Sequence, residues 1–402
     1  MTCYRHDRYE FPTRHSPPPD VLVIGAGVIG AACAYYCTSA GLRVTVVERG
    51  AIGGGTTSAC EGNILVSDKE TGPELDLALL SSRLWREIRD NLGAAAVEYH
   101  AKGGVVVAGS DAIAAGLRQL TERQRAAGVE AVDVRPDELA ELEPNLTREV
   151  AGGAHYPQDA QVQPVLAAAH LLRRARARGA AVHTGVNVTG FLRDRHGAVT
   201  GVRTDSATLP AVHARWVVNA AGTWAGQLAD LAGAPVPVLP RKGFILVTEP
   251  LPRVVRHKVY TAEYVANVAS DDAGLETSVV VEGTRAGTVL IGASRERVGF
   301  DRTVALPVLR KLADQAVGLF PFLSDVALLR SYPGFRPYCP DHLPVIGPDP
   351  RAPGLVHACG HEGAGIGLAP ATGHLVAQLL TGRAPDLPLT PFCPQRFAEA
   401  AA

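Results

Sequence analysis

The pattern of hydrophobic residues changes character just after Asp20, from a strand-like run to a helix-like one. Residues 21–24 are consecutive aliphatic residues that lead into a glycine-rich turn. Small and apolar residues then recur at helical spacing over 28–36, which predicts a strand, a tight turn and a helix. A second aliphatic run, residues 42–47, ends at Glu48 and predicts the next strand.

Amphipathic periodicity predicts four further helices, and short aliphatic runs predict a second sheet. The helices are expected at residues 75–91, 111–127, 165–178 and 306–319. Strands are expected at residues 105–107 and through 242–300, where apolar and polar positions alternate. This order favours an α/β (α+β) chain in which an antiparallel sheet accompanies the first strand–helix unit.

Composition excludes several classes of protein. A length of 402 residues corresponds to roughly two domains. The chain has 39 Lys and Arg against 40 Asp and Glu, so its net charge does not favour the binding of nucleic acid. Seven cysteines occur without a C-x-x-C pair, so neither a disulfide framework nor a metal site is expected.

Residues 1–19 contain three consecutive prolines and no apolar core, which indicates a flexible tail rather than a signal peptide. With no apolar run long enough to span a bilayer, we expect a cytoplasmic protein.

The first turn carries the clearest chemical motif. Gly25, Gly27 and Gly30 form G-x-G-x-x-G between the predicted strand and helix, an arrangement that brings a pyrophosphate to the helix N-terminus. Glu48 closes the second strand, 18 residues after the last glycine, where a carboxylate accepts both ribose hydroxyls. An acid here disfavours a 2′-phosphate, so the motif predicts NAD or FAD rather than NADP.

Other glycine-rich segments bear on which dinucleotide binds. After the second strand the chain enters Gly53–Ser58 and Glu61–Asn63, a loop that supplies N–H groups and hydroxyls for further oxygens. A predicted strand at 216–219 continues in small residues up to Trp224, which allows close approach of a cofactor. A glycine-rich helix start at 360–370 provides a positive dipole end, which suits a flavin and favours FAD.

Together these segments resemble the D-amino-acid oxidase-like superfamily of FAD-dependent oxidoreductases, over about residues 20–381. Further carriers of the resemblance are Gly287–Gly292, Gly299–Asp301, Gly334–Pro337 and Pro340–Gly347. Within the superfamily the chain is most similar to the flavin subunits of dye-linked proline, D-hydroxyproline and opine dehydrogenases. It is less similar to glycine and sarcosine oxidases.

The resemblance implies a Rossmann-like FAD-binding domain interleaved with an antiparallel-sheet substrate domain. The FAD-binding domain is expected from residues 20–80, 145–240 and 330–382, the substrate domain from 81–144 and 241–329, and a C-terminal tail from 383–402.

The resemblance also implies which residues bind FAD, without a covalent bond. Gly25, Gly27 and Gly30 are expected at the pyrophosphate, and Glu48 at the adenosine ribose. The other cofactor-binding residues are expected to be Arg49, Thr56, Thr57 and Asn63 after the second strand, Val188 at the adenine, Gly222 and Trp224 on the middle turn, and Gly363, Gly365, Ile366 and Gly367 at the pyrimidine edge.

Four residues are expected to be catalytic by the same resemblance: Arg336, Tyr260, Tyr264 and His361. Arg336 stands where related oxidases place the arginine that pairs with a substrate carboxylate, and its planar guanidinium suits two parallel hydrogen bonds. The alternative is an ordinary ion-pair arginine on a loop. Tyr260 and Tyr264 either line the substrate cavity or pack in the core. His361 is favoured over the adjacent Glu362 for orienting substrate, and the alternative is that these residues cap a turn.

Two departures from the family pattern bear on the chemistry. Sarcosine oxidases with covalent flavin carry a cysteine where this chain has Gly334, which favours non-covalent FAD, although Cys339 leaves attachment open. The lysine that activates oxygen in those oxidases is replaced by Leu290. This replacement favours a dehydrogenase, although some oxidase relatives also lack the lysine.

The expected reaction is oxidation of a C–N bond, in which a hydride passes from the substrate's α-carbon to flavin N5 and leaves an imine. The expected substrates are proline-, hydroxyproline-, D-amino-acid- or opine-like. Two alternatives stay open: a peroxide-forming glycine, sarcosine or D-amino-acid oxidase, and a non-catalytic flavin-bearing subunit of a redox complex. A redox partner subunit or a homo-oligomer is the expected assembly, with no nucleic acid and no membrane span.

Overall fold

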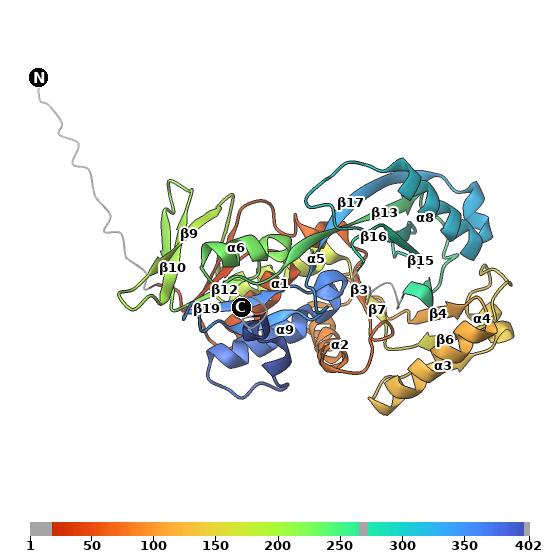
Figure 1. Cartoon of the computed structure of the whole chain (residues 1–402), viewed down its shortest axis with the longest axis horizontal. Coiled ribbons are helices and arrows are strands. Elements are labelled where there is room, and N and C mark those ends of the chain that lie inside the picture. The colour runs from red at the N-terminus through yellow and green to blue at the C-terminus, as the bar shows by residue number, and fades with distance from the viewer. Residues whose placement is uncertain (1–17, 265–271, 398–402) are drawn as a thin grey trace, which may run out of the picture.

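A six-stranded, mainly parallel sheet forms one half of the computed structural model, which describes residues 18–264 and 272–397 (Figure 1). The strand order is β18-β19-β12-β1-β2-β8, and β18 alone among these six runs antiparallel to its neighbour. The strands are β1 (Val21–Ile24), β2 (Val44–Glu48), β8 (Ala181–Thr184), β12 (Trp216–Asn219), β18 (Val345–Pro348) and β19 (Leu355–Cys359).

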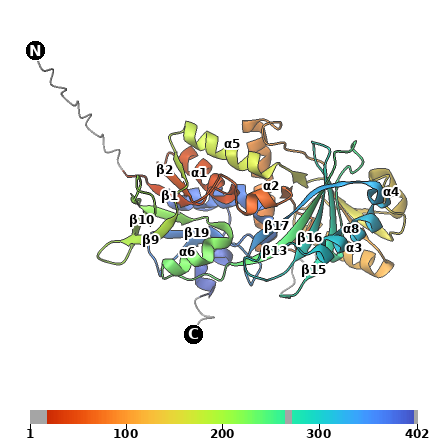
Figure 2. The same ribbon diagram turned by 90° about the horizontal axis from the view of Figure 1, so that it is seen from above.

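Strand β1 is buried on both faces, which explains its unbroken aliphatic run. Val21 and Val23 pack into the core with helices α1, α5 and α9, whereas Leu22 and Ile24 face a three-stranded sheet, β11-β10-β9. Figure 2 shows α1 and α5 on one side of the strands and α6 on the other. The elements are α1 (Val28–Ser39), α5 (Pro164–Ala177), α6 (Ala225–Leu231), α9 (Gly365–Leu380), β9 (Val188–Arg193), β10 (Val199–Thr204) and β11 (Ala211–His213).

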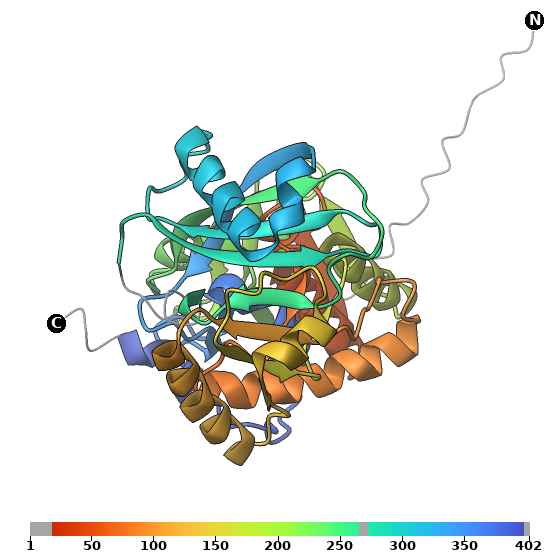
Figure 3. The ribbon, with the colours of Figure 1, turned by 90° about the vertical axis from the view of Figure 1, so that its right-hand side faces the viewer.

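An eight-stranded sheet forms the other half, in the order β17-β13-β16-β15-β14-β4-β6-β5. Its strands are β4 (Gly104–Ala108), β5 (Val132–Val134), β6 (Gly152–Tyr156), β13 (Leu239–Thr248), β14 (Lys258–Thr261), β15 (Glu276–Gly283), β16 (Val289–Arg295) and β17 (Leu328–Tyr338). Neighbours run antiparallel except for β14 and β4, which are parallel. Figure 3 looks onto the face that α8 (Leu306–Leu319) covers. Helices α3 (Asp111–Ala126) and α4 (Pro136–Leu142) pack near the β4–β6 side.

Helix α2 (Pro73–Leu92) lies against α9. Its Trp85 indole donates to the carbonyls of Ile366 (3.0 Å) and Gly367 (3.2 Å) at the start of α9. A short two-stranded sheet of β3 (Asn63–Ile64) and β7 (Ala160–Gln161) lies alongside. Within the described residues, no helix combines the length and the apolar character needed to cross a membrane.

The predicted fold class is confirmed, and the four predicted helices appear as α2, α3, α5 and α8, within two residues at each end. Strands β6 and β17 join the eight-stranded sheet, although their residues were expected in the cofactor domain. Sheet membership alone does not define domains, so the division of the chain stays a prediction.

The two chain ends differ in what the structure describes. The expected N-terminal tail lies outside the described residues up to position 17. The first part of the expected C-terminal tail packs on the body of the protein. There Phe392 is buried, and Arg396 forms an ion pair with Asp341 at 2.5 Å.

Candidate active site

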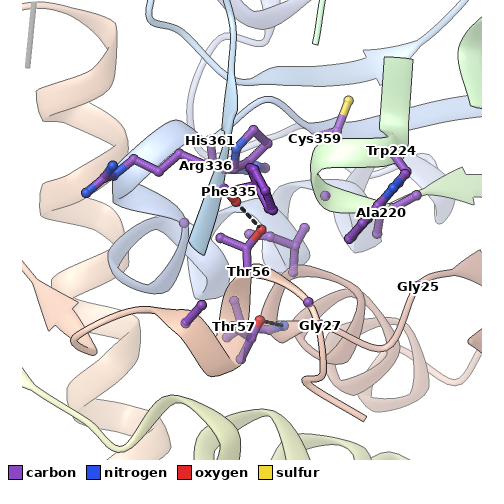
Figure 4. A pocket seen from close by; sticks show the side chains of 18 of the residues that line it. Gly25, Gly27, Thr56, Thr57, Ala220, Trp224, Phe335, Arg336, Cys359 and His361 are labelled. Atoms are coloured by element: carbon purple, nitrogen blue, oxygen red, sulfur yellow. Dashed lines mark hydrogen bonds between the residues drawn. The ribbon is translucent and has the colours of Figure 1, made fainter. Parts of the chain in front are cut away.

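A cavity of about 860 Å³ lies between the carboxyl ends of β1 and β2 and the inner face of the eight-stranded sheet. Its walls come from distant parts of the chain: the turn after β1, the η1 turn (Thr56–Ala59), strands β13 and β17, and the start of α9. Figure 4 shows these segments converging. A cavity of this size at the ends of parallel strands is typical of a cofactor-binding enzyme.

The glycine turn after β1 is possible because side chains are missing there. Gly25 has φ +108°, and a Cβ atom on it would lie 2.4 Å from the carbonyl oxygen of Ala220. A Cβ atom on Gly30 would lie 2.0 Å from the carbonyl oxygen of Gly25. Gly30, which was expected at the pyrophosphate, does not line the cavity; it lets α1 approach the turn, a packing role typical of the third glycine in this motif.

The N-terminus of α1 opens on the cavity, and its N-cap residue provides no side-chain cap. Gly27 is the N-cap residue, and the first turn contains no acidic residue. The N–H of Val28 donates to Thr57 Oγ1 at 3.0 Å (Figure 4). The other first-turn N–H groups have no partner within the helix and carry the positive end of its dipole. A glycine-lined helix end with free N–H groups of this kind fits the pyrophosphate of a dinucleotide.

Glu48 and Val188 lie at the same end of the cavity. Glu48 accepts hydrogen bonds from the backbone N–H groups of Ala26 and Gly50, each at 2.8 Å. These bonds hold the carboxylate in place, and an ionised carboxylate keeps further lone pairs for a ribose diol. The donor set therefore fits an adenosine ribose beside the glycine turn.

Arg49 and Trp224 form one side wall of the cavity. The Arg49 guanidinium carbon lies 3.8 Å from the centre of the Trp224 ring, which also stacks on Phe300 with 5.3 Å between centroids. Gly222, with φ +56°, lies on the turn beside this wall. Thr56 donates to the carbonyl of Phe335 at 2.7 Å (Figure 4), which joins η1 to β17.

Arg336 reaches the end of the cavity away from Trp224 (Figure 4). Its Nη1 donates to the carbonyl of Ser294 at 2.8 Å. The guanidinium passes directly over Gly243 of β13, where a Cβ atom would lie 2.3 Å from Nη1. Burial, with a contribution from nearby Arg295, lowers the pKa of Arg336 to about 10, so the group is still a cation at neutral pH.

The two tyrosines have different surroundings. Tyr264 lines the cavity, and its ring centre lies 4.7 Å from the Arg295 guanidinium. Tyr260 is fully buried, does not line the cavity, and donates its hydroxyl to Ser67 Oγ at 2.6 Å. The structure therefore favours the core alternative for Tyr260 and the cavity alternative for Tyr264.

His361 and Glu362 both line the cavity but have different partners. His361 Nε2 lies 2.9 Å from Thr372 Oγ1, and burial lowers the pKa of the imidazole to about 3, so the ring is neutral. Glu362 Oε1 accepts a hydrogen bond from Arg241 Nη1 at 2.7 Å, and Glu362 Oε2 lies 2.9 Å from His342 Nδ1. His361 is therefore the more available of the two.

Some of the remaining residues at the start of α9 line the cavity, and one does not. Gly363, Gly365 and Ile366 line the cavity. Gly367 does not, because it packs against β3, where its Cβ position lies 3.4 Å from the carbonyl oxygen of Asn63. Asn63 itself lines the cavity and donates to Glu61 Oε2 at 2.7 Å.

Cys60, Glu61 and Cys359 are among the cavity residues that were not singled out from the sequence as candidate site residues. Burial raises the pKa of each thiol to about 12, so both are protonated and poorly nucleophilic. Cys339 is buried and is not part of the lining. Of these three residues, only Glu61 could have been recognised from the sequence, because it is an acidic residue within the glycine-rich loop.

Comparisons with known proteins give consistent matches over nearly the whole chain. A family described as FAD dependent oxidoreductase (DAO) matches residues 20–379. Hydrogen cyanide synthase subunit HcnC of Pseudomonas aeruginosa is 31% identical over 430 residues, covering 94% of this chain and 96% of that protein.

Two solved structures share the fold. Glycine oxidase from Geobacillus kaustophilus superposes with a TM-score of 0.84 at 28% identity, over 94% of this chain and 98% of that one. L-proline dehydrogenase from P. horikoshii superposes with a TM-score of 0.86 at 25% identity, over 95% and 98%.

Proposed function

Because this chain belongs to the DAO family of FAD-dependent oxidoreductases, we propose that it oxidises the C–N bond of an amino acid or secondary amine to an imine, as a dehydrogenase. Membership confirms the resemblance drawn from the glycine motifs and the expected cofactor, FAD. The substrates proposed are proline-, hydroxyproline-, D-amino-acid- or opine-like.

One observation carries the proposal: a single cavity joins a glycine-lined helix N-terminus at one end to a partly buried, cationic Arg336 at the other. The first end fits the pyrophosphate of FAD. The second provides a planar cation on the cavity wall, which is the group that binds a carboxylate with two hydrogen bonds. The cavity therefore holds both a cofactor site and a site for an acidic small molecule.

FAD, when bound, supplies the acceptor for the two electrons and the hydrogen that leave the substrate. The residues of the chain bind and orient. Arg336 binds the substrate carboxylate, and its bond to Ser294 holds the guanidinium in one position. Neutral His361 contributes no charge to the cavity, and Tyr264 limits its volume beside the substrate. Because the carboxylate is held in one place, the adjacent C–H bond is also held in one position relative to the glycine turn. This positioning lowers the barrier to oxidation of the substrate.

A dehydrogenase is proposed ahead of an oxidase because Leu290 is apolar. Leu290 packs with Ile245, a residue of the cavity lining, so position 290 lies on the face of the sheet turned toward the cavity. This face of the sheet therefore carries an apolar side chain at the position where those oxidases have a lysine. The similarity to a glycine oxidase structure supports a peroxide-forming oxidase as the second candidate.

The name of HcnC describes that relative as a subunit. This supports a third candidate, in which the present chain works with a redox partner subunit or serves an assembly as its flavin-bearing subunit.

An anaerobic screen tests the proposal. The flavin-loaded protein is mixed with D- and L-proline, hydroxyprolines, sarcosine, glycine and opines, and the loss of its visible absorbance is followed. We expect at least one amino acid to bleach the flavin. Peroxide release under air at the same rate would identify an oxidase instead, and a flavin that stays yellow with every amine would exclude a catalytic role with this substrate class.

A further inference from the structure

Glu61 is a buried carboxylate with one oxygen left free at the Arg336 end of the cavity. Its side chain is 9% exposed and lines the cavity. Oε2 accepts from Asn63 at 2.7 Å, whereas Oε1 is buried and has no hydrogen-bond partner within residues 18–264 and 272–397. A buried carboxylate oxygen without a donor is costly, so its place on the cavity wall points to a ligand that donates.

A buried cation stands behind this carboxylate. Lys258 of β14 is 2% exposed at its side chain, and its Nζ lies 3.6 Å from Glu61 Oε2. Burial acts to lower the pKa of Lys258, but the acidic groups around it, Glu61 first and then Tyr264, Glu282 and Asp68, together outweigh burial, and the pKa is raised. Lys258 is therefore a cation beside Glu61, and it stays out of the cavity lining.

The free oxygen of Glu61 and the guanidinium of Arg336 both lie against strand β16, at positions two residues apart. Glu61 Oε1 is 2.6 Å from the place of a Cβ atom on Gly292, and Arg336 donates to the carbonyl of Ser294. The two groups therefore lie along the same short stretch of β16, and the charge of Glu61 is among those that act on Arg336. An α-amino acid has one carbon between its carboxylate and its nitrogen, so it offers an acceptor to Arg336 and a donor to Glu61 close together.

We propose that Glu61 binds the amino group of the substrate, so that Arg336 and Glu61 together select α-amino acids that keep at least one N–H. The inference rests on the proposed function and deepens it. Oε1 of Glu61 accepts the hydrogen bond, while the guanidinium of Arg336 takes the carboxylate. Primary and secondary amino acids satisfy both partners. Carboxylates without an N–H group, and fully substituted amines, leave Glu61 without a donor.

Paired probes that differ only in this N–H group test the inference. The flavin-loaded wild type and Glu61→Gln are titrated anaerobically with proline and with tetrahydrofuran-2-carboxylate, and with sarcosine and methoxyacetate. Dissociation constants come from the change in the flavin's visible spectrum or from the concentration dependence of its reduction. For Glu61→Gln we expect the amino acids to bind about 10- to 100-fold more weakly, since the lost hydrogen bond is charge-assisted. The ether analogues should bind within about threefold of the wild type.

Glu282→Gln is the matched control. Glu282 is a fully buried carboxylate on β15 that pairs with Lys102 at 2.8 Å and does not line the cavity. Its replacement removes a buried negative charge close to the same network but leaves the cavity wall intact. The preference for amine over ether should therefore stay at the wild-type value.

The outcomes separate this inference from the proposed function. Wild-type flavin that responds to amino acids, together with an unchanged preference in Glu61→Gln, would overturn the inference alone. The same loss in Glu282→Gln would overturn it too. A wild type that responds to no amino acid would overturn both. If Glu61→Gln fails to retain flavin, Glu61→Asp keeps the charge and should still prefer amine to ether, and an Asp variant without that preference would contradict the inference.

Discussion

At the scale of single residues, the proposed recognition of a carboxylate rests on Arg336. Replacing it by methionine keeps the length of the side chain and removes the charge. We expect Arg336→Met to raise the apparent KM for an amino acid by a factor of about 10 to 100, because two charge-assisted hydrogen bonds are lost. FAD content should not change. Steady-state kinetics with an artificial acceptor, alongside the flavin absorbance per chain, measure both.

Arg330 provides the comparison on the same strand. It is exposed, and its guanidinium lies over Tyr332 at 5.1 Å instead of in the cavity. Arg330→Met should leave the KM at the wild-type value. An equal effect of the two substitutions would show that strand β17, and not the guanidinium at 336, is what the first substitution disturbs.

Gly243 lets that guanidinium lie flat against β13. A Cβ atom at this position would be 2.3 Å from both Arg336 Nη1 and the carbonyl oxygen of Ser294. Gly243→Ala should therefore weaken amino-acid binding about as much as loss of the arginine and lower the free energy of unfolding by about 1–3 kcal/mol. Gly190→Ala, in a strand where nothing lies within 4 Å of the Cβ position, should do neither. Substrate titration and urea unfolding of both variants provide the comparison.

Sequence reasoning predicts the residues that belong to spaced motifs and misses those that do not. The glycine triplet and Arg336 stand in recognisable patterns, and the structure brings them to one cavity. The surroundings of Tyr260 depend on which face of β14 it occupies, which strand register decides. Glu61 is a single acid in a loop, and its partner Lys258 is almost two hundred positions away in the chain.

At the scale of elements, the β1–α1 turn depends on a hydroxyl from η1. Thr57→Val keeps the shape of the side chain and leaves the Val28 N–H without its acceptor. We expect FAD to bind about 5- to 10-fold more weakly, as the loss of one buried hydrogen bond at the cofactor site predicts. Thr38→Val removes a buried hydroxyl near the other end of α1, where it bonds to the carbonyl of Ala34, and should leave FAD affinity unchanged. Apoprotein titrated with FAD gives both constants.

Local periodicity was sufficient for most helices, since α8 begins and ends where its pattern does. Strand pairing was harder to predict because partners lie far apart in sequence. Strand β4 pairs in parallel with β14, some 150 residues later, and the alternation within each strand carries no information about that partner. The same limit applies to β17, whose neighbour β13 lies about 90 residues earlier.

At the scale of the whole molecule, burial of His361 couples folding to pH. The pKa of this imidazole is lowered by burial from 6.5 to about 3. Between these values the unfolded chain binds a proton that the folded protein does not. The stability from this residue is therefore present above about pH 6.5 and is lost as the pH falls toward 3.

Replacing the imidazole by an amide that does not titrate isolates this contribution. Between about pH 7 and pH 4.5, the free energy of unfolding of His361→Asn should fall by roughly 2–3 kcal/mol less than that of the wild type, at about 1.4 kcal/mol per pH unit. Urea unfolding at both pH values, with FAD in excess, measures the difference. Parallel losses in the two proteins would mean that His361 is not the titrating group.

The bond from Thr56 to the carbonyl of Phe335 has one more effect on the molecule. Phe335 is the immediate neighbour of Arg336, so this hydrogen bond joins the η1 turn directly to the strand that carries the guanidinium proposed to bind substrate. A displacement of this part of β17 away from η1 would break the bond and leave the Thr56 hydroxyl without its acceptor. The bond therefore restrains the position of Arg336 relative to the glycine-rich loop.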